Sequence, residues 1–107
     1  MTFRPKLVRD KIPDIIKKTG KQCRHSALSD AEYSFYLIEK LKEETEEFAE
    51  SPCLEEAADI YEVFLAMLEN WSLRKEDVET VAALKKEDRG GFTKRILLER
   101  INSETNT

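Results

Sequence analysis

Hydrophobic positions in the middle of the chain recur with the spacing of an amphipathic helix. Apolar side chains follow one another at three or four residues, as at Leu37 and Leu41, so that they share one helical face. Ser29, followed three residues later by Glu32, is a capping-box pattern that opens such a helix. The pattern therefore predicts a long helix from Ser29 to about Glu50.

A second long helix is predicted almost immediately afterwards. Ser51 and Pro52 are residues typical of an N-cap and a first helical position. Apolar residues such as Ile60 and Val63 then continue with helical spacing to about Asn70. Because the connection is a tight turn, the two long helices should pack antiparallel.

Shorter helices are predicted on both sides of this pair. Pro13 suits the first turn of a helix that runs to about Thr19, with Gly20 as its C-cap. Ser72 suits the cap of a further helix that ends near Asp88.

The glycine pair Gly90-Gly91 should stop that last helix, and residues 92–101 suit either a short helix or an extended segment. With 40% hydrophobic residues, 37% charged residues and only 3 Gly and 3 Pro, the composition is typical of a helix-rich globular protein. We predict an all-α antiparallel helical bundle in one domain, residues 1–107, with a core from about 6 to 98.

The length and the net charge of the chain indicate which kinds of binding partner to expect. Long helices in a 107-residue chain leave apolar faces uncovered, so we expect a homo-oligomer, a dimer or a tetramer. No apolar run approaches the ~20 residues of a membrane span, and no secretory pattern is present, which predicts a cytoplasmic protein with no membrane partner. A net charge of −4 without a basic helix face argues against a nucleic-acid partner.

Acidic residues are concentrated on the two long helices. Residues 43–73 include ten acids and no Lys or Arg. On a helical wheel Glu44 lies in the apolar stripe of the first helix, and Glu56 lies in that of the second. Glu47 and Asp59 follow three residues later on their helices, where side chains are neighbours of the preceding acid.

Four acids on apolar faces need a counter-charge, because a buried and unpaired carboxylate is strongly destabilising. Antiparallel packing would bring Glu44 and Glu47 opposite Glu56 and Asp59, which predicts a divalent-metal site. All-oxygen ligation favours Mg²⁺ or Mn²⁺. A di-iron site would use Glu-x-x-His pairs, and the only histidine, His25, lies outside the predicted helices.

The acidic segments resemble the motifs of a known family. Glu43-Glu44-x-x-Glu47 followed by Glu55-Glu56-x-x-Asp59 is similar to the EExxE…EExxD motif of the MazG-like, all-alpha nucleotide pyrophosphohydrolases. The segments KLVRDKIP (6–13) and EDRGGF (87–92) resemble a phosphoribosyl-ATP pyrophosphohydrolase-like subgroup. The resemblance extends from about Lys6 to Leu98, with a shorter spacing between the acidic motifs than is usual in the family.

The resemblance implies hydrolysis of a nucleoside triphosphate, or a related compound, between the α- and β-phosphates, which gives a monophosphate and pyrophosphate. It also implies the metal ligands Glu44, Glu47, Glu56 and Asp59. The helical wheel selects the same four acids. A nearby carboxylate, Glu43 or Glu47, would take the proton of the attacking water.

The triphosphate also needs positive charge from the protein. Basic residues near the start of the chain and around the glycine turn are candidates, and this turn permits close backbone approach to a ligand. The substrate-binding candidates are Arg9, Lys11, Lys86, Arg89, Gly90, Gly91, Phe92, Lys94 and Arg95. Without the resemblance, Gly-Gly after a helix is more often only a C-cap, and an aromatic residue such as Phe92 is more often part of a core.

Two alternatives stay open. One is a non-catalytic helical module that binds a nucleotide or a protein on the same fold. The other is phosphoribosyl-ATP pyrophosphohydrolase of histidine biosynthesis. Intact acids at all four expected ligand positions favour an enzyme.

Overall fold

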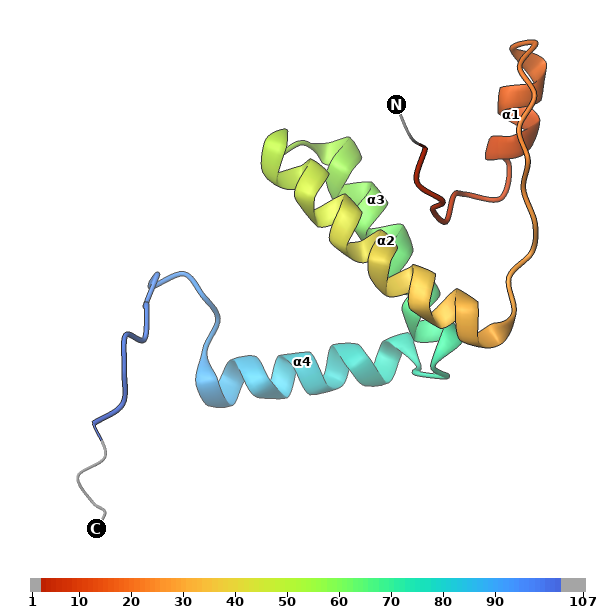
Figure 1. Ribbon diagram of the computed structural model, residues 1–107. Coiled ribbons are helices and arrows are strands. Elements are labelled where there is room, and N and C mark those ends of the chain that lie inside the picture. The colour runs from red at the N-terminus through yellow and green to blue at the C-terminus, as the bar shows by residue number, and fades with distance from the viewer. Residues whose placement is uncertain (1–2, 103–107) are drawn as a thin grey trace. The chain divides into compact units, whose positions relative to one another are not determined.

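The computed structural model describes residues 3–102 (Figure 1). This range forms four helices and no strand, which confirms the all-helical prediction. The helices are α1 (Ile12–Lys18), α2 (Asp30–Glu50), α3 (Leu54–Asn70) and α4 (Lys75–Arg89). None of these helices is long and apolar enough to cross a membrane.

The chain divides into two compact units, Met1–Arg74 and Lys75–Thr107. The first unit contains α1, α2 and α3, and the second contains α4 and the segment that follows it.

Helix α2 begins and ends where the sequence predicted. The Ser29 hydroxyl accepts a hydrogen bond from the Glu32 backbone N–H at 3.3 Å, and the Glu32 carboxylate accepts one from the Ser29 N–H at 3.0 Å. These two bonds form the predicted capping box and satisfy two backbone donors that the helix itself cannot pair.

The connection between α2 and α3 differs from the prediction. Ser51 is the C-cap of α2, and its N–H donates to the Glu47 carbonyl at 3.0 Å. The N-cap of α3 is Cys53, in an extended conformation with no side-chain cap, so Pro52 lies in the turn and not at the first helical position. The physical reason is that the residue before a proline is disfavoured in the helical region, so Ser51 leaves the helical conformation and α2 ends at Glu50.

Ser72 ends α3 and does not cap α4. It has a left-handed φ of 54°, and its N–H donates to the Glu69 carbonyl at 3.2 Å. The next N–H, from Leu73, donates to the Leu68 carbonyl at 2.8 Å. This pair of bonds is a Schellman motif that satisfies carbonyls at the end of α3, and α4 starts only at Lys75.

The predicted glycine stops are confirmed. Pro13 lies in the first turn of α1, and Gly20, with φ of 88°, follows its C-cap residue. Gly90, with φ of 85°, follows α4, and its N–H donates to the Lys86 carbonyl at 2.8 Å. Residues 92–102 contain a turn and otherwise irregular backbone, so neither a helix nor a strand forms there.

Helices α2 and α3 lie side by side (Figure 1), and the core of the first unit lies between them. The two helices run antiparallel, since the Asn70 side chain near the end of α3 donates to the Ser34 hydroxyl near the start of α2 at 2.9 Å. Within residues 3–102 the buried apolar side chains are Leu37, Val63 and Leu68. This is a small core for two helices of 21 and 17 residues.

Large apolar side chains remain exposed in both units. On α2 and α3 they include Phe35, Ile38, Tyr61 and Phe64. No residue of α4 is buried. The antiparallel α2/α3 pair is therefore observed, whereas a complete bundle and its closure by a second chain stay predictions.

Candidate metal centre

Three carboxylates converge close to the connection between α2 and α3. Glu44 projects from α2, and Glu56 and Asp59 project from the first turns of α3. Each offers one oxygen, and these oxygens all lie within 4.8 Å of one another. We refer to these three residues as the acid trio.

The trio includes two buried oxygens with no hydrogen-bond partner, Oε2 of Glu44 and Oε2 of Glu56. Glu44 as a whole is only 6% exposed. Burial raises the pKa of Glu44; hydrogen bonding and charge from Lys40 oppose this shift, and the charges of Glu47 and Asp59 add to it. Burial and then the charges of Asp59, Glu44 and Glu55 raise the pKa of Glu56.

These features fit a bound cation. A buried carboxylate oxygen without a hydrogen-bond partner destabilises the folded protein. Repulsion from neighbouring carboxylates adds to this destabilisation. A hard divalent ion would satisfy both oxygens and remove the repulsion, and an all-oxygen donor set is the kind that Mg²⁺ and Mn²⁺ prefer.

A lysine already supplies part of the counter-charge. Lys40 Nζ lies 3.1 Å from Oε1 of Glu43 and 3.3 Å from Oε1 of Glu44. Burial lowers the pKa of Lys40, but the hydrogen bonds to the two glutamates outweigh it, so the pKa is raised and the ammonium stays charged. Sequence reasoning missed this residue, although its spacing of three and four residues from the two glutamates could have indicated it.

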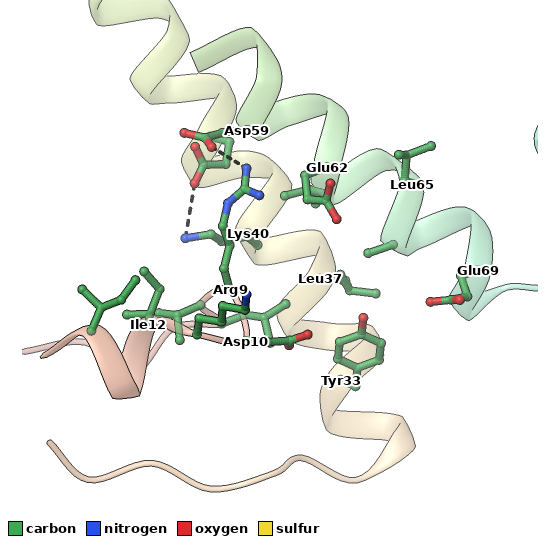
Figure 2. Close-up of a pocket in the computed structure, with 17 residues that line it drawn as sticks. Arg9, Asp10, Ile12, Tyr33, Leu37, Lys40, Asp59, Glu62, Leu65 and Glu69 are labelled. Carbon is green, nitrogen blue, oxygen red and sulfur yellow. Dashed lines mark hydrogen bonds and ion pairs between the residues drawn. The ribbon is translucent and has the colours of Figure 1, made fainter. Parts of the chain in front are cut away.

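The segment before α1 supplies two further cations. Lys6 Nζ lies 3.3 Å from Oε2 of Glu43, and Arg9 Nη2 lies 2.7 Å from Oδ1 of Asp59. Figure 2 shows the Arg9 guanidinium directed at Asp59. The hydrogen bond with Asp59 raises the pKa of Arg9. The acidic stretch on α2 and α3 is thus partly neutralised by residues far away in the sequence.

A cavity of about 710 Å³ adjoins the trio, between the N-terminal segment, α1, α2 and α3 (Figure 2). Its wall combines apolar residues such as Leu37 and Val63 with charged residues such as Arg9. Tyr33 lies in this wall, and burial, followed by the charges of Glu69 and Asp10, raises its pKa. The cavity-lining residues that the sequence had also selected are Arg9, Lys11, Glu44 and Asp59.

The two predicted proton acceptors lie in different environments. Glu47, the fourth predicted ligand, is exposed one turn beyond Glu44 and lies outside the trio. Glu43 is held by Lys40 and Lys6. Partial burial raises the pKa of Glu43, but the hydrogen bonds and charges of the two lysines outweigh it and lower the pKa overall.

The remaining substrate-binding candidates belong to the second unit. They cluster at the end of α4 and in the turn after it: Lys86, Arg89, Gly90, Gly91, Phe92, Lys94 and Arg95. Phe92 is 96% exposed and is not a core residue. Arg89 Nε lies 3.7 Å from Oδ2 of Asp88. A role for this group in binding the same ligand as the trio stays a prediction.

Comparison of the chain with protein-family models, with curated proteins and with solved structures finds no significant match. The likeness to pyrophosphohydrolases therefore rests on the motifs in the sequence.

Proposed function

We propose that the protein is a Mg²⁺-dependent nucleotide pyrophosphohydrolase, which cleaves a nucleoside triphosphate or a related compound between the α- and β-phosphates. The observation that carries this proposal is the convergence of Glu44, Glu56 and Asp59 with two buried oxygens that lack a partner. Carboxylates arranged in this way have a clear use as cation ligands, and a solvated acidic surface would not bury them.

The acid trio, Glu44, Glu56 and Asp59, would hold the ion. Glu47 lies close enough to Glu44 for its negative charge to raise the pKa of Glu44. When bound, a divalent ion polarises a phosphoryl oxygen and lowers the pKa of a coordinated water.

The chain's own residues would bind and orient the substrate. Lys40 and Arg9 place positive charge beside the trio, where the phosphates would lie. The adjoining cavity of about 710 Å³ falls within the size range of small-molecule sites, about 300–1,000 Å³, so it can accept the nucleoside part of the ligand.

Between the two proton acceptors, Glu47 is favoured over Glu43. The lysines that lower the pKa of Glu43 weaken it as a base and occupy both of its oxygens. Glu47 is exposed to solvent and makes no ion pair within residues 3–102, which leaves it available to a water molecule.

A panel of ribo- and deoxyribonucleoside triphosphates, incubated with Mg²⁺ and assayed for pyrophosphate, tests the activity. Glu56→Gln should abolish release, whereas Glu55→Gln removes an equal charge from the exposed neighbouring position and should keep it. Equal loss in both variants would argue against a specific role of the trio. Metal-dependent nucleotide binding without release would support the non-catalytic module instead.

We also propose that the active protein is a homo-oligomer. The support is the small set of buried apolar residues beside exposed Phe35, Ile38, Tyr61 and Phe64. A second copy that covers these side chains would complete the bundle. Size-exclusion chromatography with light scattering should give at least a dimer, and a fully active monomer would contradict the proposal.

A further inference from the structure

The segment 3–11 is joined to the acidic motifs by two ion pairs of different kinds. Lys6 binds Glu43, which lies outside the acid trio, whereas Arg9 binds Asp59, which belongs to it. The first pair can therefore persist when the trio holds a cation, but the second pair shares its carboxylate with the ion.

Asp59 lies between the Arg9 guanidinium and the candidate metal site. Its Oδ1 accepts a hydrogen bond from Arg9 Nη2 at 2.7 Å, while one of its oxygens lies within 4.8 Å of oxygens from Glu44 and Glu56. A guanidinium in contact with a metal ligand repels the incoming ion and reduces the negative charge that attracts it. Arg9 and a divalent cation consequently compete for the same carboxylate.

The exposure of the pair allows this competition. The Arg9 side chain is 55% exposed and that of Asp59 is 38% exposed. Ion pairs with this much solvent access stabilise a protein only weakly, so a cation held by three carboxylates can displace the arginine without disturbing the helices.

We propose that Arg9 is an electrostatic latch on the metal centre. In the metal-free protein the guanidinium holds Asp59 and keeps residues 7–11 against α3, and cation binding releases it, while Lys6 stays on Glu43 as an anchor. The released guanidinium, which lines the cavity that adjoins the trio, can then bind an anionic ligand there. This inference rests on the metal centre of the proposed function.

Calorimetric titration of the metal-free chain with MgCl₂ or MnCl₂, without nucleotide, tests the competition. Arg9→Gln should bind the ion about two- to tenfold more tightly, since it removes both the competing bond and the like charge. Arg4→Gln is the matched control, because Arg4 carries the same charge on the same segment and makes no ion pair within the described residues. Its affinity should stay within about twofold of the wild type.

Amide hydrogen exchange gives an independent readout. The Ile12 N–H donates to the Arg9 carbonyl at 3.1 Å, so its exchange reports on the segment that Arg9 holds. Saturating Mg²⁺ should speed exchange of this amide by at least about threefold in the wild type, and in Arg9→Gln it should already exchange fast without metal. Arg9→Lys keeps the charge and loses the planar fork, so its metal affinity should lie between those of the wild type and Arg9→Gln.

The outcomes separate the latch from the site itself. Equal metal affinity in wild type and Arg9→Gln, with exchange unchanged by Mg²⁺, would overturn the latch and leave the metal centre in place. No binding of either ion by any variant would overturn both. If Arg9→Gln does not fold, as judged by circular dichroism, the effect of Mg²⁺ on exchange in the wild type decides the question.

Discussion

Replacing Leu37 by alanine tests the α2/α3 packing that brings the acid trio together. Leu37 is only 1% exposed and lies two turns before Glu44 on the same face of α2. Leu→Ala changes in cores cost about 2–5 kcal/mol, and the cost is smaller where a smaller closed cavity is left behind. Because Leu37 already lines the open cavity, we expect about 2–3 kcal/mol, at the lower end of that range.

That loss is large for a chain of this size. Domains are stable by about 5–15 kcal/mol, and each kcal/mol corresponds to about 4–8 °C in Tm for a domain of about 100 residues. Leu37→Ala should therefore lower Tm by about 10–20 °C in the metal-free protein. Thermal unfolding followed by circular dichroism, at one fixed protein concentration, measures the shift.

Leu54→Ala is the matched control, since Leu54 opens α3 and is 86% exposed. Its free energy of unfolding should change by no more than about 0.5 kcal/mol. If the two variants lose the same stability, Leu37 is not a core residue and the described packing of α2 on α3 is wrong.

Three further predictions follow from local features. Ser29→Ala removes the capping box of α2 and should cost about 1 kcal/mol in urea unfolding, whereas Ser29→Asp should keep most of the stability. Because burial raises the pKa of Glu44 above 4.5, its contribution to stability is present below that pH and is lost as pH rises through the higher folded value. As the pH rises above about 4.5, the metal-free wild type should thus lose stability relative to Glu44→Gln, and urea midpoints that stay parallel for the two proteins would refute the reasoning. Gly90→Ala places a side chain at φ of 85° and should cost about 1 kcal/mol, seen as faster amide exchange in the last turn of α4, while Gly91→Ala should leave exchange unchanged.

The sequence alone determined the features that depend on short-range periodicity. The start of α2 at its capping box and its end at Glu50 follow from residues within one turn of each boundary. The helical wheel also selected Glu44 and Glu56 as acids on apolar faces, and both have a buried oxygen. A repeat of 3.6 residues is a local property, so it can be read without knowing what packs on the helix.

Boundaries that depend on competing local signals were harder to predict. Ser51 and Ser72 both resemble N-caps, but each closes the helix before it. A serine can satisfy either end of a helix, and the choice is made by the backbone conformation of its neighbours, here the proline after Ser51 and the Schellman bonds around Ser72.

Only the tertiary structure decided which charges from distant parts of the chain meet. Lys6 and Glu43 are 37 residues apart, and Arg9 and Asp59 are 50 residues apart, so no helical period links them. The sequence also could not separate Glu47 from the ligands. Glu47 lies on the same helix and in the same motif as Glu44, but it is exposed, whereas Asp59 from α3 belongs to the trio. Ion pairs and metal ligands are selected by distance in space, and that distance is set by how α2, α3 and the N-terminal segment pack, which no short stretch of sequence contains.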